Sequence, residues 1–227
     1  MAPHILDTPN NVVGHFDRLR AAGFDTVIRY LAPSSNSWKV VGPGEARAIA
    51  AAGFKLALVF EGDGRAHGST IGGRDGLAAL AQAKAAGAPM GAVIYYTEDY
   101  DPAPNDIPSI IAAFKAFKAA LGGYYRVGAY CSGYCASELV EAQAVDTTLD
   151  ATTGQTLPLI WITQSLGFRG SRDYLNSGKP FVMFQLLPGK AGGLDEDPDI
   201  TFHNYANENV DIGAFVPFAV PAVGGVA

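Results

Sequence analysis

The sequence contains little cysteine. Its 227 residues include two cysteines, Cys131 and Cys135. Their C-x-x-x-C spacing is neither the C-x-x-C of a thioredoxin-type motif nor part of a complete zinc-ligand set. We therefore expect two unreactive thiols, with a disulfide between them as the alternative.

Positive charge and long hydrophobic runs are also scarce. The chain has 16 Lys and Arg residues and 22 Asp and Glu residues, so its net charge is −6. Such a chain offers no basic face for phosphates, which excludes nucleic acid as a partner. The apolar stretch 215–227 is too short and too interrupted by proline and glycine to span a bilayer. The start, "MAPHILDTP", shows no signal peptide. Localisation stays open, export to the cell envelope included, and a monomer is the default.

Apolar runs and amphipathic stretches alternate along the whole chain. The expected strands cover 4–8, 25–32, 55–62, 91–99, 125–132, 157–165, 179–187 and 199–205. The expected helices cover 12–23, 44–53, 73–87, 107–123, 135–144 and 171–176. Four of these helices end at a glycine, namely Gly23, Gly53, Gly87 and Gly122.

Alternating strands and helices predict a parallel sheet buried on both faces. Eight units favour an α/β fold of the single (β/α)8 TIM-like barrel type over 1–227, with 216–227 as a short C-terminal tail. An open doubly wound sheet is the alternative. No G-x-G-x-x-G follows the first strand, which counts against a dinucleotide-binding fold.

A parallel barrel carries its active site at the carboxyl ends of its strands. Polar and aromatic groups fall at these ends from nearly every expected strand, and we take them as site candidates. The candidates for catalysis are Asp7, Asp99 and Asp101. The candidates for substrate binding are Arg29, Glu61, Tyr96, Tyr130, Trp161, Gln185 and Asp199. The plainer alternatives are that the acids cap strand ends and face water, and that the aromatic residues pack in the core. Arg29 is expected to pair with an acid of this rim.

The fourth strand ends in "TEDYDP", and its side chains alternate between two faces. Asp99 and Asp101 share a face and lie about 6.6 Å apart along an extended strand, so we expect them to converge on one bound group. Glu98 faces the helices, where a loop amide or a cation would be its partner. When two carboxylates lie close together, their repulsion raises the pKa of one of them, which then keeps its proton. A protonated carboxyl group beside an ionised one is the pair of groups that catalyses glycoside hydrolysis. Without a calcium-type loop or paired histidines, we expect no metal and no cofactor. A divalent-metal phosphoesterase stays an alternative.

Several segments together resemble a known family. These are "LDTP", "GFDTVIRYLAP", "AAGFKLALVFEGDG", "AQAKAAGAPMGAVIYYTEDYD", "YRVGAYCSGY" and "MFQLLP". In order and spacing they resemble the glycoside-hydrolase-like domain catalogued as domain of unknown function 1906. That family is a TIM barrel related to the family-25 lysozymes, which cut the glycan strands of peptidoglycan. The resemblance covers about Asp7 to Phe215.

The resemblance implies roles for individual residues. Asp7 matches the acid that ends the first strand of the lysozyme barrel, and Asp199 resembles the acid near its last strand. Asp99 and Asp101 match its D-x-E pair, in which the glutamate donates the proton. Asp101 is one methylene shorter than that glutamate, and small positioning errors are costly in catalysis.

The sequence therefore predicts a glycoside hydrolase for a bacterial cell-wall (peptidoglycan-like) or related amino-sugar glycan. Asp101 is the expected general acid, and Asp99 and Asp7 are expected to polarise the substrate. The alternative is a carbohydrate-binding barrel that no longer cuts.

Overall fold

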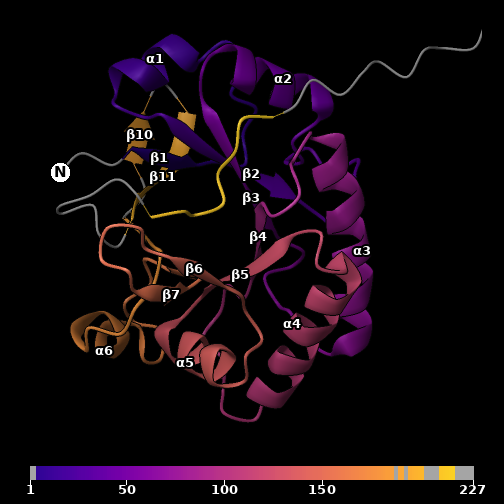
Figure 1. Cartoon of the computed structure of the whole chain (residues 1–227), viewed down its shortest axis with the longest axis vertical. Coiled ribbons are helices and arrows are strands. Elements are labelled where there is room, and N and C mark those ends of the chain that lie inside the picture. Colours follow the sequence, from indigo (N-terminus) through magenta and orange to yellow (C-terminus); the bar gives the residue numbers. More distant parts are fainter. Residues whose placement is uncertain (1–3, 187–188, 192–193, 202–209, 218–227) are drawn as a thin grey trace, which may run out of the picture.

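The computed structural model describes residues 4–186, 189–191, 194–201 and 210–217. Seven parallel strands form its curled central sheet (Figure 1). In sheet order they are β1 (Ile5–Asp7), β2 (Thr26–Leu31), β3 (Lys55–Phe60), β4 (Val93–Thr97), β5 (Arg126–Cys131), β8 (Ile160–Ile162) and β9 (Met183–Gln185). All seven overlap strands that the sequence predicts.

Six helices cover the outer face of this sheet within the described ranges. They are α1 (Phe16–Ala21), α2 (Pro43–Ala51), α3 (Ser69–Ala85), α4 (Ile107–Leu121), α5 (Gly133–Glu141) and α6 (Ser171–Asn176). Each follows one strand of the sheet, as in a βα repeat. The glycines predicted to stop four of the helices all adopt positive φ angles, between 60° and 94°.

The prediction of a full (β/α)8 barrel is wrong in the last part of the chain. The place between β9 and β1 is taken by β11 (Leu194–Thr201), which runs antiparallel to both. No helix of the described residues follows β9, so the seven parallel strands form a half-barrel, and the antiparallel β11 stands between β9 and β1 in place of an eighth βα unit. A parallel return needs a crossover of a dozen or more residues. Only eight residues, 186–193, separate β9 from β11, so the chain returns antiparallel.

Three further short strands lie within the described residues. β10 (Gly189–Ala191) pairs with β11, and β6 (Thr147–Leu149) pairs with β7 (Thr156–Pro158), each pair antiparallel. β10 and β6 were not expected from the sequence, whereas β7 overlaps the start of the strand expected over 157–165. The predicted eighth strand, 199–205, overlaps β11 over 199–201, and 202–205 lie outside the described residues.

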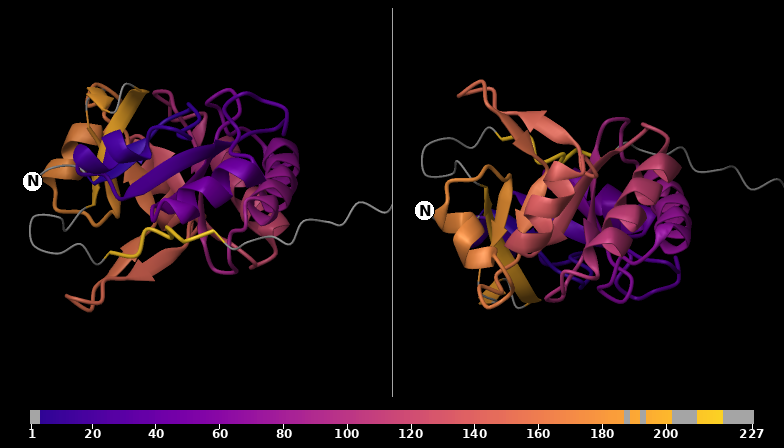
Figure 2. Two further views of the ribbon diagram at one scale, coloured as in Figure 1. Left: turned by 90° about the horizontal axis from the view of Figure 1, so that it is seen from above. Right: turned by 90° about the horizontal axis from the view of Figure 1, so that it is seen from below.

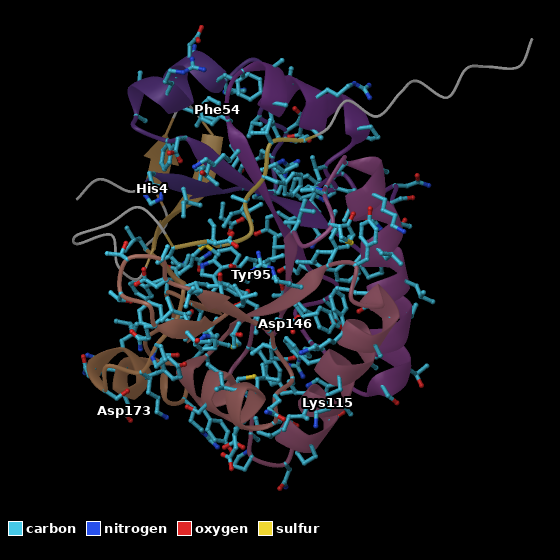
Figure 3. All side chains as sticks on the ribbon, viewed as in Figure 1. His4, Phe54, Tyr95, Lys115, Asp146 and Asp173 are labelled. Atoms are coloured by element: carbon cyan, nitrogen blue, oxygen red, sulfur yellow. The ribbon has the colours of Figure 1, made fainter. Side chains whose placement is uncertain are left out.

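The β6–β7 hairpin and the segment 210–217 lie on the same side of the molecule (Figure 2). Phe215 exchanges two backbone hydrogen bonds of 2.8 Å with Leu56, at the start of β3. The Tyr95 hydroxyl, inside the ring of strands (Figure 3), donates to the carbonyl of Ile212 at 3.0 Å. This segment therefore covers the amino ends of the strands, and the carboxyl ends are left for a site. Of the predicted tail, residues 218–227 lie outside the described residues.

Both cysteines are buried and free, which agrees with the expected thiols. Their contact, together with burial, raises the pKa of the Cys135 thiol well above its ordinary value. In the described part of the chain, no helix has the length and apolar character needed to cross a membrane.

Helices α3 and α4 pack closely because two glycines of α3 face α4. A Cβ atom added to Gly72 would lie 2.0 Å from the carbonyl oxygen of Ala113, and one added to Gly76 would lie 2.7 Å from the Ala120 Cβ. Backbone atoms cannot yield as a flexible side chain can, so any side chain here forces the helices apart.

Gly72→Ala is therefore expected to lower the free energy of unfolding by about 3 kcal/mol, the upper end for overpacking. The neighbouring Gly73 has no atom within 4 Å of an added Cβ, so Gly73→Ala should stabilise the helix by about 0.5–1 kcal/mol. Urea unfolding of both variants measures the difference. Equal stabilities would contradict the close approach of the two helices.

Candidate functional site

A small cavity of about 60 Å³ lies at the carboxyl ends of the strands. It is lined by the carboxylates of Asp7, Glu61 and Asp99. Asp7 is the last residue of β1, Glu61 directly follows β3, and Asp99 comes two residues after β4. The structure thus brings together three acids from three strands that are far apart in the sequence.

The Asp7 carboxylate is buried and is held by two donors. The Tyr30 hydroxyl and the Gln185 side-chain amide each donate to its Oδ2 at 3.2 Å. The Tyr130 hydroxyl in turn donates to Gln185 Oε1 at 2.8 Å. Burial, followed by the charge of Asp7, raises the pKa of Tyr30 well above its ordinary value, so Tyr30 keeps its proton and remains a donor. The orientation of Asp7 is therefore fixed from two sides.

Asp99 differs from an ordinary aspartate in its acidity. Burial, followed by the negative charge of Glu61, raises its pKa, and a hydrogen bond with the Tyr130 hydroxyl opposes this shift. The backbone N–H of Asp99 donates to the carbonyl of Gly64 at 2.9 Å, which ties the end of β4 to the loop after β3. The raised pKa of Asp99 favours a role as proton donor.

Glu61 also lines a second cavity of about 470 Å³, and Thr97 is the other residue that the two cavities share. The Lys39 ammonium forms an ion pair with Glu61. It also lies 5.3 Å from the centre of the Tyr30 ring, within the range of a cation–π contact. Lys39 thus lines the large cavity and holds the carboxylate that the two cavities share.

Asp101 does not share a cavity with Asp99, contrary to the expected convergence. β4 ends at Thr97, so the alternation of faces does not extend to Asp101. Its Oδ1 accepts a hydrogen bond of 2.7 Å from the backbone N–H of Arg169, in the loop before α6. Asp101 lines neither of the two cavities, and its predicted role as general acid stays a prediction.

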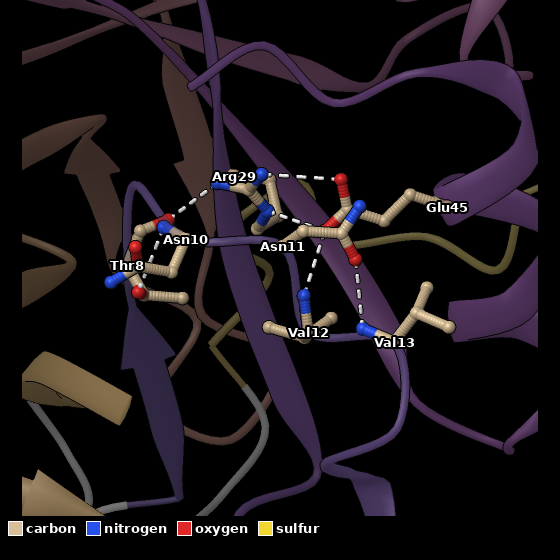
Figure 4. Close-up of polar contacts among 7 residues, drawn as sticks. All are labelled: Thr8, Asn10, Asn11, Val12, Val13, Arg29 and Glu45. Carbon is tan, nitrogen blue, oxygen red and sulfur yellow. Dashed lines mark hydrogen bonds and ion pairs between the residues drawn. The ribbon is translucent and has the colours of Figure 1, made fainter. Parts of the chain in front are cut away.

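Arg29 pairs with Glu45 of α2 and not with an acid of the rim (Figure 4). The Nε of Arg29 donates to Glu45 Oε1 at 2.7 Å, and its Nη1 donates to the carbonyl of Thr8 at 2.6 Å. Glu45 Oε1 also accepts from the backbone N–H of Val12 at 3.1 Å. The Arg29 side chain is fully buried and lies on the helix side of the sheet. It connects β2, α2 and the loop after β1 and lies in neither cavity.

The candidate aromatic residues occupy two different environments. Tyr130 and Trp161 line the small cavity, with their rings 4.6 Å apart and edge to face. Tyr96 lines the large cavity, but its ring stacks on Phe117 and its hydroxyl donates to Asp75 Oδ2 at 2.8 Å. All three side chains are buried.

Glu98 faces the helices, as the alternation of β4 predicts. Its Oε2 accepts from the backbone N–H of Ala66 at 2.7 Å, and His67 Nε2 lies 3.6 Å from its Oε1. Burial raises the pKa of Glu98 to about 8, against the opposing effect of the Ala66 hydrogen bond. Glu98 anchors the loop after β3 from outside the cavities.

The backbone of Asp199 pairs with Ile5 and Gln185, and its side chain lies outside the described part.

Sequence reasoning missed Tyr30, Thr97 and Lys39. Tyr30 is two residues from Ile28, which faces the interior of the sheet, so the alternation of β2 could have found it. Lys39 lies in a loop, where no periodicity predicts its direction. Within the described ranges, no group of three or more His, Cys, Asp or Glu side chains is arranged to hold a metal ion.

Comparison with known proteins identifies a family and several similar folds. The sequence profile of the Rv2525c-like, glycoside hydrolase-like domain matches residues 17–184. None of the curated proteins matches the sequence significantly. Among solved structures, the Tat-secreted protein Rv2525c of Mycobacterium tuberculosis, in complex with HEPES, is similar with a TM-score of 0.68 at 19% identity. The match covers 89% of this chain and 96% of that chain.

Two further structures share the fold. An uncharacterized protein of B. stearothermophilus has a TM-score of 0.60 at 15% identity, over 87% of this chain and 95% of that chain. The modular autolysin LytC of Streptococcus pneumoniae, in complex with a synthetic peptidoglycan ligand, has a TM-score of 0.59 at 13% identity. That match covers 87% of this chain and 46% of LytC. At these identities the likeness concerns the fold alone.

Proposed function

Because the chain belongs to the family of Rv2525c-like, glycoside hydrolase-like domains, we propose that it hydrolyses glycosidic bonds of a peptidoglycan-like cell-wall glycan. The observation that carries the proposal is the meeting of Asp7, Glu61 and Asp99 at one cavity at the strand ends. The peptidoglycan ligand of the similarly folded LytC supports the choice of glycan.

The two aspartates suit different steps of glycoside hydrolysis. Asp99, whose pKa is raised, gives its proton to the leaving glycosidic oxygen as the C–O bond breaks, and water then adds to the anomeric carbon and returns a proton to Asp99. Asp7, held by Tyr30 and Gln185, provides the negative charge that stabilises the oxocarbenium-like transition state. Glu61 raises the pKa of Asp99 by its own charge. The family resemblance gives the proton to Asp101 instead, so the two assignments are rivals.

A carbohydrate-binding protein that does not cut is the second candidate function. One observation favours it. Asp101 occupies the position that the resemblance gives to the lysozyme glutamate, and its carboxylate accepts a hydrogen bond from the Arg169 backbone N–H. Binding of the glycan without release of new reducing ends would favour this function.

The pH profile of reducing-end release from purified peptidoglycan tests the proposed hydrolysis. A general acid works only while protonated, so activity is expected to fall as pH rises through the pKa of Asp99. Burial and Glu61 raise that pKa, which places the fall above the ordinary range of aspartate. Glu61→Gln removes one of the two causes, so the fall should move to lower pH.

Glu141→Gln is the matched control, because Glu141 is an exposed residue of α5. Its profile should coincide with that of the unmodified protein. A fall of activity at high pH that does not move in Glu61→Gln would contradict its assignment to Asp99. A lack of reducing ends at every pH would contradict hydrolysis altogether.

A further inference from the structure

The Tyr130 hydroxyl lies where hydrogen bonds from the two aspartates of the proposed mechanism meet. It donates to Gln185 Oε1 at 2.8 Å, and the Gln185 amide donates to Asp7 Oδ2 at 3.2 Å. The same hydroxyl forms a hydrogen bond with the carboxyl group of Asp99 at the small cavity, which both side chains line. Hydrogen bonds therefore join Asp99 to Asp7 through Tyr130 and Gln185.

The backbone and a neighbouring ring hold Tyr130 in this place. Tyr130 lies one residue before the end of β5 and is paired with Thr97 of β4. Its carbonyl accepts the backbone N–H of Glu98 at 2.8 Å, which fixes the chain directly before Asp99. The Trp161 ring packs edge to face against the Tyr130 ring at 4.6 Å. The ring is thus held in position, and the hydroxyl group keeps its freedom to rotate.

A phenol has one proton to donate, and two of its neighbours here can only accept it. Neither Gln185 Oε1 nor an ionised Asp99 carboxylate carries a proton of its own. Tyr130 Oη also lies 3.0 Å from the Thr163 hydroxyl, which can donate as well as accept. Water competes little, because Tyr130, Thr163 and Gln185 are only 8%, 1% and 3% exposed. Gln185 and an ionised Asp99 therefore compete for the same Tyr130 proton.

We propose that Tyr130 is a positioning residue for the acid, and that its O–H group turns from Gln185 to Asp99 when Asp99 releases its proton. The inference rests on the proposed function, in which Asp99 is the proton donor. Before the transfer, protonated Asp99 donates to Tyr130, and Tyr130 donates to Gln185. After the leaving glycosidic oxygen has taken the proton, the Asp99 carboxylate accepts from Tyr130 in place of Gln185. No covalent bond of Tyr130 breaks, because the O–H group only rotates.

The rotation stabilises the negative charge that forms on Asp99 as the glycosidic bond breaks. An interaction that strengthens toward the transition state raises kcat, whereas one made equally with the bound substrate does not. Tyr130→Phe removes the hydroxyl and keeps the ring. We expect kcat to fall about 10- to 100-fold, the effect of one hydrogen bond to a charged group, and KM to change little.

The pH profile of kcat/KM for a soluble peptidoglycan oligomer separates this role from a structural one. The Tyr130 hydrogen bond favours the ionised form of Asp99, so Tyr130→Phe should move the fall of activity to higher pH. Glu61→Gln should move it to lower pH, so the two variants act in opposite directions. Tyr130→Phe leaves in place the other titratable groups around this cavity, namely Asp7, Tyr30 and the ion pair of Glu61 with Lys39.

Gln185→Met tests the competition for the proton. Methionine is similar in length to glutamine, but its thioether is a weak acceptor and cannot donate to Asp7. Tyr130 then donates to Asp99 without a rival, so the fall of activity should move to lower pH. In Tyr130→Phe there is no proton to compete for, so adding Gln185→Met to that variant should cause no further shift.

Protein that carries ¹³C at its aspartate carboxyl groups shows the same shifts without substrate. The Asp99 signal is the one that Asp99→Asn removes, and its titration should move up in Tyr130→Phe and down in Gln185→Met. Tyr95→Phe is the matched control. Tyr95 is also buried and packs edge to face on Trp161, but its hydroxyl donates at the amino ends of the strands, so this titration should coincide with that of the unmodified protein.

An Asp99 titration that stays in place or moves down in folded Tyr130→Phe would overturn the inference, as would equal shifts from Gln185→Met with and without Tyr130. If Tyr130→Phe did not fold, Gln185→Met would decide, and an unmoved Asp99 titration there would overturn the inference. The proposed hydrolysis is judged separately, by release of reducing ends from unmodified protein. Cutting with an unmoved titration would leave the function and remove only the role of Tyr130.

Discussion

Asp99→Asn is expected to lower the release of reducing ends about 10²- to 10⁴-fold, the usual contribution of a general acid. Asparagine has nearly the same shape as aspartate but has no proton to give to the leaving oxygen. Binding of the glycan should persist, because the Tyr30 and Gln185 contacts with Asp7 remain. The measurement combines a reducing-sugar assay with calorimetric binding of the same oligomer.

The fold should tolerate this substitution. The pKa of Asp99 is raised in the folded protein, so above its ordinary pKa the ionised carboxylate favours the unfolded state. Asparagine removes that charge, and the melting temperature at neutral pH should not fall. A large fall would mean that lost activity reports unfolding and not the loss of a proton donor.

Asp101→Asn is the matched comparison, because it removes a carboxylate from the same loop, two residues after Asp99. Its contact with the Arg169 backbone survives as an amide carbonyl, so activity is expected to remain within a few-fold of the unmodified protein. The opposite result, with Asp101→Asn inactive and Asp99→Asn active, would return the proton to Asp101, as the family resemblance has it.

The strands of the sheet were predictable from local pattern, because each is a short apolar run bounded by turn residues. The closure of the sheet was not, because it depends on what pairs across the gap. Residues 199–205 were expected as an eighth parallel strand, yet the eight residues between β9 and β11 are too few for a crossover. Connection length therefore decided the topology where residue type did not.

The site shows the same division between periodic and irregular segments. Alternation along β4 predicted that Glu98 faces the helices, and the same alternation turns Thr97 toward the cavity. The same rule applied to β2 separates Arg29 from Tyr30. Beyond the strand end, Asp101 follows a loop whose direction is set by the Arg169 backbone, and no local pattern encodes that contact.

Removing one member of the buried Arg29–Glu45 pair is expected to lower the free energy of unfolding by about 3–5 kcal/mol. Both side chains are almost completely buried, with 0% and 4% of their surface exposed. Arg29→Met leaves the Glu45 carboxylate without its cation, and Glu45→Leu leaves the guanidinium with only the carbonyl of Thr8. Either change places an uncompensated charge in the interior, and urea unfolding measures the loss.

The double variant Arg29→Met with Glu45→Leu separates the cost of an unpaired charge from the value of the pair. Apolar residues of similar volume need no partner, so the double variant should be clearly more stable than either single variant. The exposed pair of Arg20 and Asp17 is the control, and Asp17→Asn should leave the unfolding midpoint nearly unchanged. If the double variant were as unstable as the single ones, the charges themselves would be needed to hold β2, α2 and the loop after β1 together. In that case Asp7, which leads into that loop, should also lose its fixed orientation, and glycan cleavage should fall with stability.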